Sequence, residues 1–111
     1  MAKVFVVQEP LRKSPHTGQL ITSFNLTPAR IYGELEVLLE HRQIALTPGP
    51  MIHTLKRKLQ HFSDDDYLLC VGDPSAIAAA AMVAAHMNRG TVTMLKWDKP
   101  TKSYIKTTIT V

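Results

Sequence analysis

The sequence has little cysteine and no apolar run long enough for a membrane, and each shortage excludes a class of protein. The single cysteine, Cys70, excludes an internal disulfide and fits a reducing cytoplasm. It lies in an apolar stretch, so we interpret it as a small buried hydrophobe. The longest apolar run, 76–85, is shorter than the roughly 20 residues that a bilayer span needs. The first residues, MAKVFVVQEP, predict neither a secretion signal nor an anchor. We expect a cytoplasmic protein that does not bind membranes.

Motifs for catalysis, cofactors or metals are also missing. The VGDP turn stands where a phosphate-binding loop would stand, but it has one glycine and no following lysine. Asp73 would also repel an anion there, so a helix cap is the simpler interpretation. Asp64, Asp65 and Asp66 are adjacent and point in different directions, so we expect them to be solvated rather than to bind a metal. We therefore predict no enzyme activity, no catalytic residue, no cofactor and no metal site.

The composition that remains is that of one folded domain with a basic surface. Hydrophobic residues make up 45% of the chain and charged residues 20%, which is typical of globular proteins. A length of 111 residues suits a single domain, 1–111. The formal net charge of +4 favours an anionic partner such as nucleic acid.

The stretch 67–90, YLLCVGDPSAIAAAAMVAAHMNRG, predicts a buried strand, a tight turn and a helix that ends at Gly90. Pro74 suits the first helical turn, and Gly90 can adopt the left-handed backbone conformation that ends many helices. Because the helix is apolar on all sides, it must be covered on more than one side, either by its own fold or by a second copy. Small side chains permit close contact across a two-fold axis, so we predict a homo-oligomer. Its interface would contain Ile77, Ala80, Ala81 and Ala84.

The other segments predict short strands and a second helix. KVFVVQ at 3–8 reads as a strand, EPLRKSPHTGQ at 9–19 as a loop, and 21–26 as extended. For 29–40 a helix competes with a single turn followed by a strand from Gly33, and the alternation of Leu35, Val37 and Leu39 favours the strand. QIALT at 43–47 would then return as its hairpin partner.

Two segments complete the predicted fold. MIHTLKRKLQHF, after Pro50, predicts an amphipathic helix. TVTMLKW and SYIKTTITV predict a C-terminal hairpin around DKPTK. The fold class we predict is α+β, with a mostly antiparallel sheet of five or six short strands and two helices.

Basic and aromatic residues occur together in the second helix and the hairpin. Cations beside exposed rings are typical of single-stranded nucleic-acid binding, because phosphates are neutralised while bases stack. Two registers of the hairpin are open: pairing Asp98 with Ser103 sets Trp97 beside Tyr104 on one face, and pairing Trp97 with Ser103 buries Trp97. The second register gives the cleaner apolar face and is favoured, and in both Tyr104 points to water. The candidate nucleic-acid contacts are Lys56, Arg57, Lys58, Lys96, Trp97, Lys99, Lys102, Tyr104 and Lys106.

In YLLCVGDPSAIAAAA and LKWDKPTKSYI the chain resembles small accessory proteins encoded by tailed bacteriophages. The resemblance covers the C-terminal half, from PGPMIHTLKRKL onward. It implies a host-cytoplasmic setting and a role on DNA or RNA, on polymerases or on a host target, and it assigns no role to any residue.

Two functional hypotheses follow. The first is a small, non-enzymatic, oligomeric protein that binds single-stranded DNA or RNA. The alternative is a protein-interaction module, an inhibitor or cofactor of a polymerase or host enzyme, with the apolar helix or a hairpin edge supplying the contact.

Overall fold

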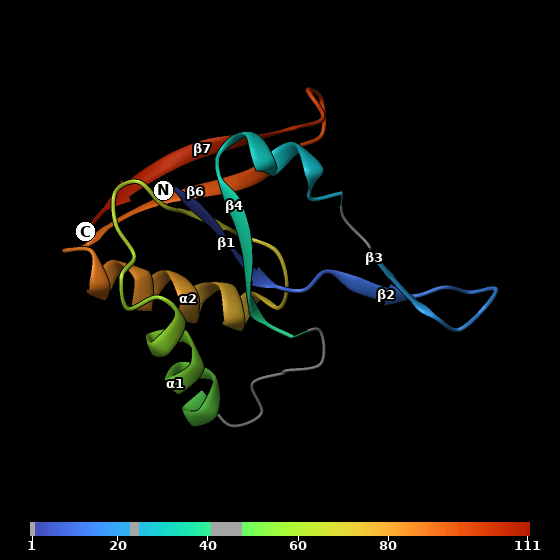
Figure 1. Ribbon diagram of the computed structural model, residues 1–111, viewed down its shortest axis with the longest axis horizontal. Coiled ribbons are helices and arrows are strands. Elements are labelled where there is room, and N and C mark those ends of the chain that lie inside the picture. Colours follow the sequence, from blue (N-terminus) through green and yellow to red (C-terminus); the bar gives the residue numbers. More distant parts are fainter. Residues whose placement is uncertain (1, 23–24, 41–47) are drawn as a thin grey trace.

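The computed structural model describes residues 2–22, 25–40 and 48–111 and shows a small α+β domain (Figure 1). Its main sheet has five strands in the order β4-β1-β5-β6-β7, and a two-stranded hairpin, β2–β3, projects from it. The strands are β1 (Lys3–Gln8), β2 (Leu11–Lys13), β3 (Leu20–Thr22), β4 (Glu34–Leu39), β5 (Tyr67–Leu69), β6 (Thr91–Asp98) and β7 (Ser103–Thr110).

The main sheet is mixed, so the prediction of a mostly antiparallel sheet was wrong. β4, β1, β5 and β6 run parallel, and only β7 runs antiparallel to its neighbour β6. Parallel neighbours need a long crossover between them, usually a helix. Here the helix α1 (Pro48–Lys58) lies between β4 and β5, and α2 (Pro74–Met87) lies between β5 and β6. The positions of the five strands of the main sheet were predicted, but the direction of their pairing was not.

Both helices cover the same face of the sheet (Figure 1). Leu55 and Leu59 of the α1 segment are fully buried in a core that also contains Phe5 and Leu68 of the strands. The apolar stripe predicted for this helix is thus confirmed, although the helix begins at Pro48 and ends at Lys58.

The local signals around α2 are confirmed. The Asp73 carboxylate accepts hydrogen bonds from the backbone N–H groups of Ser75 (2.8 Å) and Ala76 (3.4 Å), which caps the helix. Pro74 occupies the first turn, and Gly90 adopts a φ of 85° just beyond the helix end. The chain itself covers α2 on two sides, with the sheet beneath it and α1 along one flank.

The opposite face of the sheet is covered by a short 3-10 helix, η1 (Thr27–Ile31), and the residues around it. Ala29 is fully buried there, against a second core that includes Val4, Val6 and Tyr104. The single turn predicted before Gly33 and the strand predicted from Gly33 are both confirmed.

Two predictions about the N-terminal half have different outcomes. The segment 9–19 was predicted as a loop, but Leu11–Lys13 forms β2 and pairs with β3. The prolines, glycine and charges of these eleven residues indicated a loop, whereas the short strand within them is stabilised by hydrogen bonds to β3, which lies beyond the turn. The hairpin partner predicted at 43–47 lies outside the described residues.

No helix in the described ranges is both long and apolar enough to cross a membrane.

Candidate functional site

The basic residues predicted on the second helix have separate roles. Lys56 and Arg57 of α1 are exposed. Lys58 is only partly exposed, and its Nζ donates hydrogen bonds to the carbonyl oxygens of Val37 (3.2 Å) and Leu38 (3.1 Å) in β4. Lys58 therefore holds the end of α1 against β4, and its ammonium group is occupied in this conformation.

The hairpin adopts the register that we had not favoured. Trp97 pairs with Tyr104 and Asp98 pairs with Ser103, and the two rings meet edge to face at 5.0 Å between centroids. The favoured register assumed that Ile105 and Ile109 belong to the core. Both are exposed instead, because no described element covers that part of β7 on the helix side.

Tyr104 does not point to water, contrary to our prediction. It is 3% exposed, and its hydroxyl donates a hydrogen bond of 3.1 Å to the carbonyl oxygen of Asn25. Burial raises the pKa of the Tyr104 phenol. Residues around η1 cover this face of the hairpin, and no local sequence pattern indicated that coverage. Tyr104 is therefore part of the core and presents no face to a nucleic-acid base, whereas Trp97 remains partly exposed.

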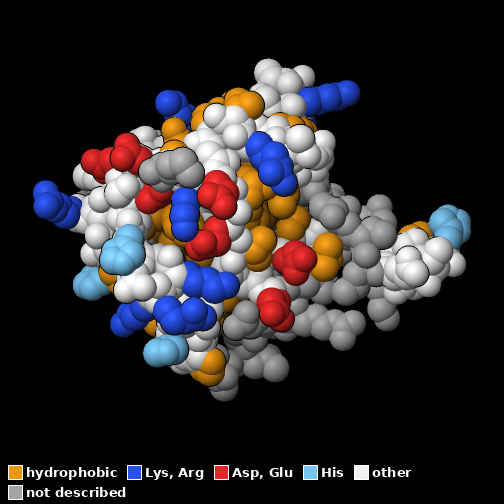
Figure 2. Space-filling model, in the orientation of Figure 1, with side chains coloured by type: hydrophobic (Ala, Val, Ile, Leu, Met, Phe, Trp, Pro, Cys, Tyr) orange, Lys and Arg blue, Asp and Glu red, His pale blue; other side chains and the backbone are white. Residues whose placement is uncertain are grey.

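The predicted cations do not gather on one face. Lys96, Lys99, Lys102 and Lys106 are all exposed. However, Lys96 pairs with Ile105 and Lys106 pairs with Leu95, so Lys96 and Lys106 lie on opposite faces of the sheet. Figure 2 shows basic side chains over α1 at the lower left and others near the β6–β7 turn at the upper right, with acidic and apolar side chains between them.

The residues predicted to form an oligomer interface lie mostly inside the chain's own core. Ala80 and Ala84 are fully buried against the sheet, so they cannot contact a second copy in this fold. Ile77 is partly buried against the same core. Ala81 alone borders an open hollow.

An apolar ridge remains exposed on α2. Met82 is 73% exposed, and it borders a hollow on each side of the helix. A long apolar side chain that is this exposed, with an apolar hollow on each side, marks a contact surface more than a core position. The sequence signal was the one long side chain within the alanine run, which the prediction treated as buried.

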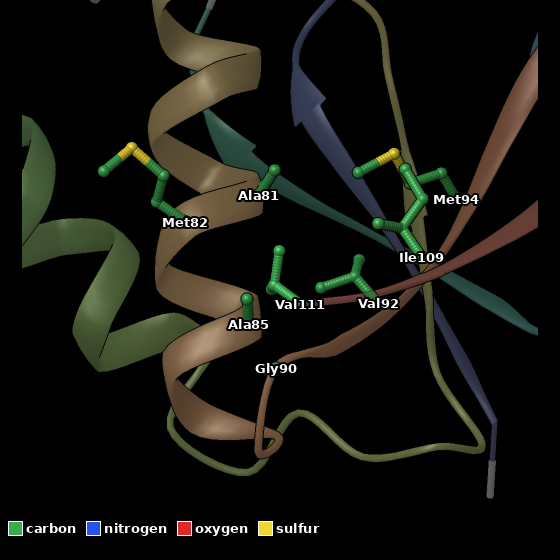
Figure 3. A pocket seen from close by; sticks show the side chains of 8 residues that line it. All are labelled: Ala81, Met82, Ala85, Gly90, Val92, Met94, Ile109 and Val111. Atoms are coloured by element: carbon green, nitrogen blue, oxygen red, sulfur yellow. The ribbon is translucent and has the colours of Figure 1, made fainter.

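The first hollow lies between α2 and the strands β6 and β7 (Figure 3). Its volume is about 190 Å³. On its strand side, Ile109 is 45% exposed and Val111 is 92% exposed. Every lining residue is apolar or glycine: Ala81, Met82, Ala85, Gly90, Val92, Met94, Ile109 and Val111.

The second hollow, which we call the α1–α2 groove, lies between the two helices and has a volume of about 290 Å³. Its lining is apolar except at two positions, Lys56 of α1 and His86 of α2. Both of these side chains are exposed. The groove is lined by Ile52, Lys56, Ala79, Met82, Val83 and His86. It therefore combines apolar walls with groups that can carry positive charge.

The carboxyl ends of the parallel strands are another possible ligand site, since ligands of open sheets often bind where the strand order reverses. The reversal here lies between β1 and β5. The buried Gln8 side chain fills it, and its Oε1 accepts a hydrogen bond from the Asp73 N–H at 2.8 Å. The Ser75 hydroxyl and backbone N–H hold the pKa of the Asp73 carboxyl below its usual value. A fixed negative charge thus occupies the end of α2 that would otherwise attract a phosphate.

The aspartate cluster is partly structural. Asp66 is 7% exposed and accepts hydrogen bonds from the Lys3 N–H (3.0 Å), the Ser63 N–H (3.0 Å) and the Ser63 hydroxyl (3.2 Å). Our prediction that all three aspartates are solvated was wrong for Asp66 and correct for the exposed Asp64 and Asp65. Within the described ranges, no group of three or more His, Cys, Asp or Glu residues could hold a metal ion.

Cys70 is partly buried, next to β5, and burial raises the pKa of its thiol. A thiol with a raised pKa is less often the reactive thiolate, which agrees with a packing role.

Comparison with known proteins supports the phage resemblance. Curated proteins and solved structures gave no significant match. One family model, described as Phage Pam3 gp32-like protein, matches residues 2–111, which is nearly the whole chain. A match of that extent goes beyond the C-terminal half on which the resemblance was first seen. The chain belongs to the Phage Pam3 gp32-like protein family.

Proposed function

We propose that this phage protein is an accessory factor that acts by binding another protein, and that the α1–α2 groove is its docking site. The partner segment would place apolar side chains against Ile52, Met82 and Val83 and acidic side chains near Lys56 and His86. The observation that carries the proposal is the exposed Met82 beside a groove with apolar walls and a basic border.

The chemistry of the groove supports a protein partner. Methionine side chains are flexible and polarisable, so an exposed methionine adapts to apolar partners of different shape. Exposed apolar patches rimmed by polar residues are typical of protein-interaction surfaces and ligand-binding grooves. The net charge of +4 favours an acidic partner and speeds encounter with it.

The test compares two variants with the same substitution at two exposed apolar residues. Met82→Glu places a carboxylate in the groove, and Ile31→Glu places one on η1, on the other face of the sheet, where Ile31 is 82% exposed. The free energy of unfolding of both variants should lie within about 0.5 kcal/mol of the wild-type value, because exposed positions contribute little to stability. In nuclease-treated lysate of the phage's host, the wild type and Ile31→Glu should retain the same partner and Met82→Glu should lose it. Equal retention by Met82→Glu would refute this docking site.

A second candidate, binding to single-stranded nucleic acid, is favoured by one observation. Four exposed lysines, at 96, 99, 102 and 106, lie on one hairpin beside a partly exposed Trp97. Replacing Lys99 and Lys102 with alanine should weaken binding of a fluorescent oligonucleotide, and higher salt should weaken it further, because phosphate contacts release counterions. Absence of binding at low salt would exclude this candidate. Because Met82→Glu leaves the hairpin untouched, it should not affect this binding.

A further inference from the structure

The outer edge of β7 is open along most of its length. β7 pairs with β6 on one side, and no strand in the described part of the chain pairs with it on the other. The one described hydrogen bond to its outer edge is at its start, where the Tyr32 hydroxyl donates to the Tyr104 carbonyl oxygen at 2.9 Å. Sheet edges are commonly protected by proline, bulges or several charges. Beyond Tyr104, β7 has one charged residue, Lys106, no proline, and an uninterrupted register with β6.

The hydrogen-bond phase of β7 identifies which backbone groups are free. The Val111 N–H donates to the Gly90 carbonyl oxygen at 2.8 Å, so the odd-numbered residues of this strand direct their amides and carbonyls toward β6. The even-numbered residues Lys106, Thr108 and Thr110 therefore direct theirs outward. The Tyr32 bond to the even-numbered Tyr104 comes from outside and agrees with this phase.

Two exposed isoleucines are spaced evenly along this edge. Ile105 and Ile109 lie on the helix side of β7 and are 40% and 45% exposed. They are placed symmetrically about Thr107, two residues away on either side. A strand with this spacing is complementary to itself when a second copy lies antiparallel to it.

We propose that β7 pairs antiparallel with β7 of a second copy, about a two-fold axis at Thr107. This surface and this partner are independent of the α1–α2 groove. Lys106 would exchange backbone hydrogen bonds with the partner's Thr108, and Ile105 would lie beside the partner's Ile109, each pair occurring twice. The register fits the outward phase of the even-numbered residues. An axis at Lys106 fits the same phase but sets two lysines directly opposite each other, which is unfavourable.

The pairing joins the two main sheets into one continuous sheet with α1 and α2 of both copies on the same face, because a two-fold axis normal to the sheet preserves its faces. Homodimers commonly use one surface patch twice in this way. The dimer also places the exposed isoleucines against each other instead of against water, which lowers the free energy of the assembled state.

The first test is sedimentation velocity of the full chain at micromolar concentration, with two variants of one outward residue. Thr108→Pro removes an outward N–H and adds a ring to the edge without affecting the ladder to β6. Thr108→Ala keeps that N–H. The wild type and Thr108→Ala should sediment as dimers and Thr108→Pro as a monomer, with matching circular dichroism spectra. A monomeric wild type would overturn the proposal, as would a dimer unaffected by Thr108→Pro.

The second test remains decisive if Thr108→Pro does not fold. In a Cys70→Ser background, Thr107→Cys should form a disulfide-linked dimer under mild oxidation. Opposed residues at a non-hydrogen-bonded antiparallel pair have Cα atoms about 4.5 Å apart, within the range of a disulfide. Thr101→Cys, in the exposed hairpin turn, is the control and should stay monomeric. Equal cross-linking of the two variants would overturn the register at Thr107.

Discussion

Removing the Asp66 carboxylate should strongly destabilise the protein, although it lies in a run of three aspartates that looks like solvated surface. The carboxylate connects the start of β1 to the turn before β5, through the Lys3 N–H and two groups of Ser63. Asp66→Ala deletes all three hydrogen bonds and leaves two backbone amides without their acceptor.

The magnitude follows from the number and type of bonds. Hydrogen bonds to a charged group contribute about 1.5–3 kcal/mol each, and some of the freed groups can be solvated, since Lys3 and Ser63 are only partly buried. We expect a loss of about 3 kcal/mol from a total stability of about 5–15 kcal/mol. Urea unfolding followed by circular dichroism would show this loss as a midpoint lower by about 1–3 M.

Two further variants serve as comparisons for Asp66→Ala. Asp66→Asn keeps one acceptor oxygen and should therefore cost less than Asp66→Ala. It should still destabilise the protein, because its NH₂ group cannot accept the remaining bonds. Asp65→Ala removes an exposed neighbouring carboxylate and should change stability by less than about 0.5 kcal/mol. If Asp66→Ala and Asp65→Ala unfold at the same urea concentration, the buried role assigned to Asp66 is wrong.

Three further predictions concern stability. Because folding raises the Tyr104 pKa, the stability that the protonated phenol contributes is present below pH 10 and is lost as pH rises through the folded pKa. The urea midpoint should therefore fall between pH 8 and pH 11, and it should fall less for Tyr104→Phe than for the wild type. Gly72→Ala should cost about 3 kcal/mol, because Gly72 has a φ of +118° and an added Cβ would lie 2.5 Å from the Gln8 Cβ, whereas Gly18→Ala has open space and should cost about 1 kcal/mol in the same urea assay. Lys58→Met keeps the apolar stem but deletes both bonds to β4, so its thermal midpoint should fall, while that of Arg57→Met should not.

Predictions that depended on neighbours in the sequence were the most successful. Asp73 and Pro74 start α2 and Gly90 follows its end, because capping groups and left-handed glycines act on backbone groups a few residues away. The alternation of Leu35 and Val37 identified β4 for the same reason, since the side-chain period of a strand is a local property.

Predictions of which face of a strand is buried were less successful, because burial depends on segments far away in the sequence. The hairpin at 91–110 was predicted, but its register was not. Tyr104 was assigned to water because it points away from Ile105 and Ile109, which were expected in the core, whereas the segment around η1 covers Tyr104. The alternation of Ile105 and Ile109 suggested core, yet they lie where no described element covers the sheet. An alternating pattern separates two faces without saying which one is buried.

The sequence by itself determined where most strands and helices lie, how α2 is capped, and that the chain carries a net positive charge. The tertiary structure decided the parallel order of β4, β1, β5 and β6, the burial of Tyr104 and Asp66, and the exposure of Met82 and Ile109. The physical reason is the range of the interactions. Backbone capping and side-chain periodicity act over a few residues, whereas strand order and burial are fixed only when segments far apart in the chain compete for the same surface.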